Sequence, residues 1–193
     1  MYKRQPYNST TSLVWDLPFG RGRRFMADAP LALDVLLGGW QVAGVNTVNA
    51  GDPVTLTYTP GPAFQVSGIQ QDFRGANNYR PNVTGEVLVP NGTPQNYLSR
   101  DAVVLPTDPS QPFGNAGRNT VRGPRFWSLD VQATKRVPMP WPQGSLEVRV
   151  EAFNVLNRSN FRAPNGNRSA NAFGTITSTY DPRILQVGVK LAF

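Results

Sequence analysis

Hydrophobic and polar residues alternate along several stretches of the chain with a period of two, which is typical of a β-strand with one apolar and one polar face. The clearest stretch comes last. Its apolar positions are Leu185, Val187, Val189, Leu191 and Phe193, and the polar or small residues between them are Gln186, Gly188, Lys190 and Ala192. About nine to eleven residues of a tilted strand cross a membrane, and an outer-membrane barrel turns its apolar face to lipid. The pattern predicts the closing strand of a transmembrane β-barrel.

Four earlier stretches repeat the alternation. They predict strands at residues 9–17, 40–58, 127–137 and 146–152. The stretch at residues 40–58 is longer than a strand needs to cross a bilayer. Together with the last stretch they predict an all-β fold with about five long antiparallel strands in up-and-down order.

Charged residues alternate with the apolar ones in the later strands. A row of ionisable side chains is costly inside a dry protein core and costs little in a hydrated lumen. The candidates for the lumen-facing side are Asp130, Gln132, Glu147, Arg149, Glu151 and Lys190. They either form a solvated face or make specific contacts with a plug or a solute.

The connections between the predicted strands differ in length. Residues 138–144 form a tight turn, whereas residues 59–124 and 157–182 form long stretches rich in Gly, Pro and Asn. Membrane barrels have short periplasmic turns and long extracellular loops, which sets the direction of the chain. Residues 18–39 are a longer periplasmic connection, in which residues 31–37 form a short helical or strand-like excursion.

Aromatic residues fall at two levels of this arrangement, as the two aromatic girdles of a membrane barrel do. One level holds Trp15, Trp40, Trp141 and Phe193, and the other holds Trp127 and Tyr58. Lys135 and Arg125 interrupt the apolar rows near strand ends, where long basic side chains can snorkel to water.

Composition limits the alternatives. With 39% hydrophobic residues in 193 and no long apolar run, the chain is not a helical membrane protein. It has no Cys and no His, which excludes disulfides, thiolate and imidazole metal sites and catalysis that uses either residue. We therefore expect no enzyme activity, no catalytic residues, no metal site and no cofactor.

The charge balance is basic, with a net charge of +7 and a pI of about 10.2. A basic chain often binds nucleic acid or an anionic surface. Here the basic residues are scattered, and the only tight cluster, Arg21 with Arg23 and Arg24, lies in a turn flanked by Gly and Pro. We expect no nucleic-acid partner.

A soluble or secreted β-sandwich that binds carbohydrate or another surface is the alternative. Alternating strands are more often the half-buried face of such a sandwich than a lipid face. A sandwich would bury Leu185, Val187, Val189 and Leu191 in its own core, whereas a barrel would leave them toward lipid. The terminal Phe193, the tryptophan levels and the loop asymmetry favour the barrel.

Several runs of sequence resemble the carboxy-terminal barrel segment of TonB-dependent outer-membrane receptors. The resemblance is greatest to the large Oar-like receptors with an amino-terminal domain of the carboxypeptidase-regulatory type. The runs lie at residues 17–25, 38–44, 117–124, 151–161 and 181–193. Their order along nearly the whole chain is specific for the family but not for the ligand.

The resemblance implies a barrel of roughly 22 strands with a plug, energised through TonB from the inner membrane. Residues 1–193 would be the carboxy-terminal part of that barrel, without plug or signal peptide, and not transport-competent alone. The implied location is the bacterial cell outer membrane. The implied partners are outer-membrane lipid, the rest of the barrel and plug, the TonB system and the barrel-assembly machinery. That machinery would read an assembly signal made of Phe193, Leu191, Val189 and Val187.

Ligand capture, if any, belongs to the long outer loops, because loops on a rigid frame commonly carry binding. The candidates there are Tyr79, Phe113, Arg118, Arg122 and Phe161, which lie among Asn, Gln and Arg residues suited to sugars, peptides or lipid headgroups. Arg118 and Arg122 either pair with anionic lipid phosphates or stabilise turns near a strand entrance.

Overall fold

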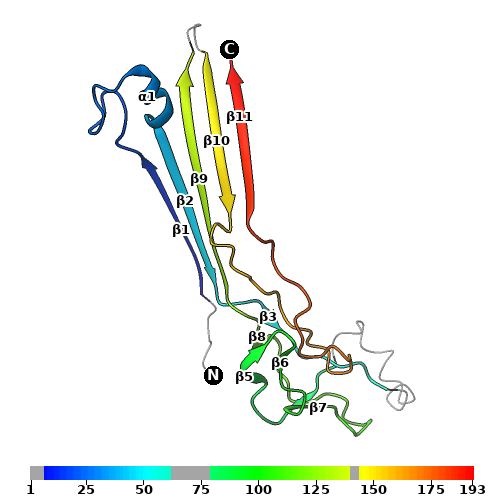
Figure 1. Cartoon of the computed structure of the whole chain (residues 1–193). Helices are drawn as coiled ribbons and strands as arrows, with labels where there is room; N and C mark the ends of the chain where they lie inside the picture. The colour runs from blue at the N-terminus through cyan, green and yellow to red at the C-terminus, as the bar shows by residue number, and fades with distance from the viewer. Residues whose placement is uncertain (1–6, 62–78, 140–143) are drawn as a thin grey trace. The chain divides into compact units, whose positions relative to one another are not determined.

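The computed structural model describes residues 7–61, 79–139 and 144–193 (Figure 1). The chain divides into two compact units. The sheet unit comprises Tyr7–Val48, Trp127–Ser159 and Asp181–Phe193, and the loop unit contains Asn49–Phe126 and Asn160–Tyr180. Each unit is formed by segments that are far apart in the sequence.

The sheet unit contains one five-stranded sheet. Its strands are β1 (Asn8–Asp16), β2 (Trp40–Asn49), β9 (Phe126–Pro138), β10 (Ser145–Phe153) and β11 (Ile184–Ala192). Their order in the sheet, β1-β2-β9-β10-β11, is also their order in the chain, and successive strands run in opposite directions (Figure 1). The predicted all-β, antiparallel, up-and-down arrangement is confirmed.

The strand register places the apolar rows on one face. Between β10 and β11, Leu146 lies opposite Leu191, Val148 opposite Val189, Val150 opposite Val187 and Ala152 opposite Leu185. Between β10 and β9, Leu146 lies opposite Val137, Val150 opposite Ala133 and Ala152 opposite Val131. Directly opposed residues share a face of an antiparallel sheet, so the apolar rows of the three strands lie side by side, interrupted by Lys135, which lies opposite Val148.

The single strand predicted at residues 40–58 is wrong. Strand β2 ends at Asn49, and Gly51 follows with a φ of 91°. Only glycine fits there, because a Cβ would overlap the carbonyl oxygen of Gly123. The chain then forms β3 (Pro53–Val54), which pairs with β8 (Val121–Arg122) in the loop unit.

The connection between β1 and β2 contains α1 (Leu31–Leu37), so the helical form of the predicted excursion is correct. The helix ends at Gly38, whose N–H donates to the carbonyl of Asp34. Among the described residues no helix has the length and apolar character needed to span a membrane.

The described residues of the two long connections fold into the loop unit. Besides β3 and β8 it contains β4 (Asn82–Val83) paired with β7 (Val103–Val104), and β5 (Leu88–Thr93) paired with β6 (Asn96–Leu98). A small apolar core joins them, formed by Val54, Leu56, Leu98, Val103, Ala116, Val121 and Phe173. Residues expected to be plain loops therefore fold around a core of their own.

Tyr58, which was predicted to lie in an aromatic girdle, is buried in the loop unit. Tyr58 is only 3% exposed and its hydroxyl donates to the Pro112 carbonyl at 2.6 Å, so it belongs to the interior of the loop unit. Its prediction as a membrane-interface residue was wrong, because the strand that would have carried it there stops at Asn49. Trp141 lies outside the described residues.

We expect the loop unit to unfold at alkaline pH. The pKa values of Tyr58, Tyr97 and Tyr180 are raised, in each case mainly by burial, with the neighbouring Tyr79 adding to the shift of Tyr58 and Asp52 to that of Tyr180. The raised pKa values mean that the folded loop unit favours the neutral phenols. The contribution of these tyrosines to the stability of the loop unit is therefore complete below the ordinary pKa of 10.0, and it is lost as the pH rises through their raised pKa values.

Tyrosinate absorbance and tryptic digestion of the loop unit, followed over the same alkaline pH range, test this expectation. The two transitions should coincide, and Tyr97→Phe should reduce the steepness of the loss. Smooth titration of all tyrosines at the ordinary pKa, with the loop unit still resistant to protease, would contradict it.

Candidate functional site

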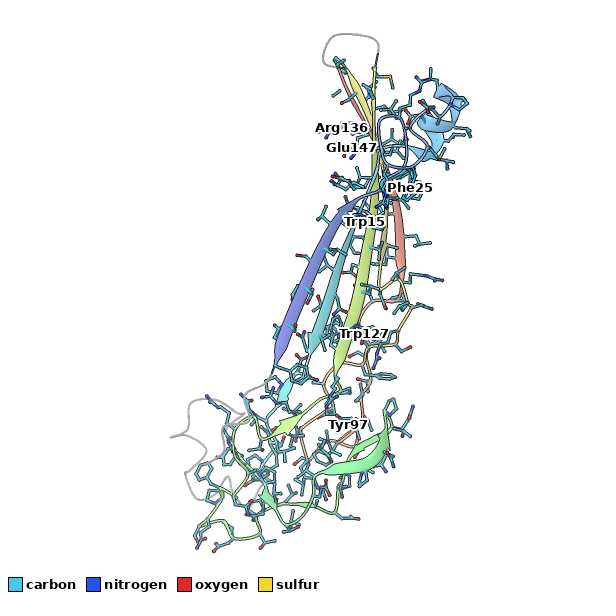
Figure 2. The ribbon with its side chains drawn as sticks, turned by 90° about the vertical axis from the view of Figure 1, so that its left-hand side faces the viewer. Trp15, Phe25, Tyr97, Trp127, Arg136 and Glu147 are labelled. Carbon is cyan, nitrogen blue, oxygen red and sulfur yellow. The ribbon has the colours of Figure 1, made fainter. Side chains whose placement is uncertain are left out.

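The polar face of the sheet carries a connected row of charges. Both Arg136 and Arg149 donate to the carboxylate of Glu147 at 2.9 Å, and Arg149 lies 3.7 Å from Glu151. Arg136 and Glu147 lie side by side near one end of the sheet (Figure 2). The Glu147 side chain is 13% exposed and that of Arg136 is 71% exposed, so the row opens to solvent at its basic end. Its opposite charges compensate one another, and such exposed ion pairs contribute little to stability.

Lys190 and Gln132 lie on the same face. The register places Lys190 opposite Glu147 and Gln132 opposite Glu151. The Gln132 amide donates to the hydroxyl of Thr134 at 2.8 Å. The residues predicted to face the lumen are therefore brought together on one side of the sheet.

Asp130 has a structural role at the end of that row. Its carboxylate accepts hydrogen bonds from the Ser128 hydroxyl and from the backbone N–H of Asn154, each at 2.8 Å. Asn154 has a φ of 48° and its side chain accepts from the N–H of Arg158 and donates to the Arg158 carbonyl. Asp130 thus holds the turn in which β10 ends, and this turn begins inside the run at residues 151–161.

The opposite face of the sheet is apolar and exposed. Val187, Val189 and Leu191 on β11 are 69%, 68% and 52% exposed, and Phe193 is 96% exposed. Within the described part of the chain, β1 and β11 each pair with a neighbour on one side only. The residues predicted as an assembly signal therefore lie on or just beyond a strand with an open edge.

Asn46 and Lys135 interrupt the apolar face, and both have hydrogen-bond partners. The Trp127 indole N–H donates to the Asn46 side chain at 2.7 Å across β9 and β2. Lys135 is 6% exposed, and its ammonium donates to the carbonyls of Asp34 and Gly38 at the end of α1. The expectation that Lys135 snorkels to water was wrong, because the connecting segment supplies acceptors that local sequence does not reveal.

The predicted ligand residues of the loop unit occupy different environments. Tyr79 is 3% exposed and stacks on Phe113 with ring centroids 5.6 Å apart, so it is unavailable to a ligand in this conformation. Arg122 donates to the Gly51 carbonyl at 3.3 Å, which is the turn-stabilising contact considered for it. Phe161 forms an isolated β-bridge with Thr179. Phe113, at 44% exposure, remains accessible.

Arg118 is exposed and lines a depression of about 480 Å³ in the loop unit. The other lining residues are Thr55, Thr57, Arg80, Asn165, Gly166 and Asn167. Among the described residues no carboxylate lines it, so Arg80 and Arg118 share the depression with hydroxyl and amide groups and without a compensating acid. Sequence analysis missed Arg80, because its approach to Arg118 follows from the folding of the loop unit.

The described residues contain no cluster of three or more acidic side chains that could hold a metal ion. A model of the outer membrane beta barrel domain matches residues 3–186 of the chain, which covers strands of both units. No curated protein and no solved structure gives a significant match. The two-faced antiparallel sheet agrees with the family match, since an apolar outer face and a polar inner face are what a membrane barrel requires. The chain belongs to the family of outer membrane beta barrel domains and is a protein of the bacterial outer membrane.

Proposed function

We propose that this chain forms part of the wall and outer ligand-binding region of a TonB-dependent receptor of the Oar-like type. In this proposal it takes part in the uptake of a ligand across the outer membrane and catalyses no reaction. The observation that carries the proposal is the two-faced sheet joined to an ordered loop unit. A wall alone needs strands and turns, whereas ligand capture needs a folded surface in addition to them.

The polar face supports the part of the proposal that concerns the lumen. The row formed by Arg136, Glu147, Arg149 and Glu151 is linked by short contacts and alternates in sign. Such a row offers both donors and acceptors to a plug inside the barrel, or to a solute passing it. In a soluble sandwich the apolar face of β11 would instead need a protein cover.

The open edges support a role within a larger barrel. The smallest membrane barrels have about eight strands, and the five strands of this sheet cannot close. Strands β1 and β11 would pair with further strands of the same receptor. The unpaired edge of β11 would first be offered to the barrel-assembly machinery, in the manner of strand addition.

The residues that line the depression in the loop unit indicate the chemical class of the ligand. Arg80 and Arg118 supply positive charge, while Thr55, Asn165 and Asn167 supply hydroxyl and amide groups. Arginine suits planar carboxylates and phosphates, and amide and hydroxyl groups suit sugar hydroxyls. The proposed ligand is an anionic, hydroxyl-rich molecule such as an acidic sugar.

Binding of the receptor, purified as its gene encodes it, to the periplasmic domain of TonB tests the proposed function. We expect binding that increases when the ligand is present, because transport by this class requires contact with TonB. Absence of any binding, with the barrel correctly folded in the outer membrane, would overturn the TonB-dependent role while leaving the barrel fold intact.

A further inference from the structure

The helix in the connection between β1 and β2 exposes its apolar side chains. Leu31, Leu33, Val35, Leu36 and Leu37 are 63%, 43%, 42%, 66% and 52% exposed. α1 contains no buried residue. A helix of a water-soluble connection would turn such residues toward a core. The exposed apolar surface needs an occupant.

The polar groups of the same segment form hydrogen bonds with one another. The Asp34 carboxylate accepts the backbone N–H of Arg21 at 2.7 Å, and the Arg21 side chain donates to the Ala29 carbonyl at 2.9 Å. The Trp40 indole donates to the Leu36 carbonyl at 2.9 Å. Helix, turn and strand are therefore held together by their polar atoms, which leaves the leucines on the outside as a stable arrangement.

The helix lies on the apolar side of the sheet. Lys135 donates to carbonyl oxygens of Asp34 and Gly38, and it stands on the same face of β9 as Ala133 and Val137. That face carries the apolar rows of β10 and β11. The exposed surface of α1 is therefore continuous with the lipid-facing surface of the barrel.

The turn before the helix supplies exposed positive charge. Arg23 and Arg24 are exposed, and among the described residues neither guanidinium has a hydrogen-bond or carboxylate partner, although Arg24 lies 5.5 Å from the Phe25 ring centroid. The Phe25 ring packs on Phe19 at 5.5 Å, and Trp15 lies nearby at the same end of the sheet (Figure 2). Aromatic and basic residues at this level are typical of the membrane interface.

A depression of about 340 Å³ lies between the apolar surface of α1 and the basic turn before it. Its lining includes the basic residues Arg21, Arg23 and Lys135 and the apolar residues Leu31, Val35 and Val137. Asp34 also lines it, but its carboxylate already accepts the Arg21 N–H. Cationic and apolar groups side by side match the boundary between a phosphate headgroup and its acyl chains.

We propose that residues 18–39 form an interfacial anchor in the periplasmic leaflet of the outer membrane. The apolar side chains of α1 enter the acyl region, and Arg23 and Arg24 bind the phosphate of an anionic phospholipid. The periplasmic side follows from the direction of the chain, because this connection and the turn after β9 leave the same end of the sheet. The anchor would fix the depth and rotation of this part of the barrel wall.

Single-cysteine labelling can test the anchor, since residues 1–193 contain no cysteine and any cysteine elsewhere in the receptor can be replaced by serine. The receptor is reconstituted in phosphatidylcholine vesicles, or in an equimolar mixture with phosphatidylglycerol, with a fluorophore on Leu36→Cys. We expect quenching by brominated lipid and protection from aqueous iodide. A fluorophore on Thr107→Cys, an exposed loop-unit position, should show the opposite pattern. Equal iodide quenching at both positions, with no effect of brominated lipid, would overturn the anchor.

The headgroup preference needs its own variant. Phosphatidylglycerol should increase the lipid quenching at Leu36→Cys, and the double variant Arg23→Gln with Arg24→Gln should lose that increase. Arg21 is left in place because its side chain holds Ala29. Arg183→Gln, at an exposed arginine before β11, is the matched control and should keep the increase. An increase that survives the double variant, or that soluble glycerophosphoglycerol abolishes, would overturn binding of a leaflet lipid.

Discussion

Phe173→Ala is expected to lower the free energy of unfolding of the loop unit by about 3–5 kcal/mol. Phe173 is 5% exposed and belongs to the core with Leu56 and Val103. The guanidinium groups of Arg100 and Arg168 each lie 5.7 Å from its ring centroid, so the substitution also removes two cation–π contacts. Urea titration of the reconstituted receptor, read by proteolysis of the loop unit, measures the loss.

Phe173→Leu is the matched control, because it keeps most of the apolar volume and removes only the aromatic ring. We expect it to cost about 1–2 kcal/mol, from imperfect packing and the lost cation–π contacts. Equal stability of the alanine and leucine variants would mean that the side chain fills no core, and would contradict the packing described for the loop unit.

Val187→Arg should destabilise the folded barrel by about 2–4 kcal/mol, the cost of a basic side chain near the middle of the lipid-facing surface. Val187 lies near the centre of β11, is 69% exposed and stands opposite Val150. In a bilayer its surroundings are acyl chains that cannot solvate a guanidinium. The folded fraction in vesicles, measured against urea by the heat-modifiable migration typical of barrels, reports the effect.

Gln186→Arg supplies the comparison at the adjacent position. Gln186 lies on the polar face opposite Glu151, so an added arginine gains an acidic neighbour and stays in water. We expect a change within about 0.5 kcal/mol of zero. If both arginine substitutions had the same effect in vesicles, the assignment of the two faces to lipid and lumen would be wrong.

The strands of the sheet could be predicted closely because their two faces meet different solvents. The stretches predicted at residues 127–137 and 146–152 became Phe126–Pro138 and Ser145–Phe153. Lipid favours apolar side chains and water favours polar ones, so apolar and polar residues alternate along a strand that lies between them. The same pattern gave a wrong prediction at residues 40–58. Apolar and polar residues still alternate after Gly51, but the apolar ones there belong to the core of the loop unit.

The candidate site also has a part that the sequence predicts and a part that it does not. The row from Glu147 to Glu151 was predictable, since residues two apart on one strand share a face wherever that strand lies. Arg80 was missed and Tyr79 was chosen as a ligand residue, although Tyr79 is 3% exposed and Arg80 lines the depression. Neighbours in an irregular segment have no fixed relation of faces, so composition alone could not separate them.

The sequence by itself determined which residues of a strand share a face, because residues two apart on a strand lie on the same side. The lengths of the connections and the resemblance of several runs to a known family indicated the up-and-down order and the class of protein. The tertiary structure decided the rest. It brought Leu56, Val103 and Phe173 into one core and placed Lys135 beneath the end of α1. Contacts between residues so distant in the chain follow from how whole segments pack, and no local pattern of residues encodes that packing.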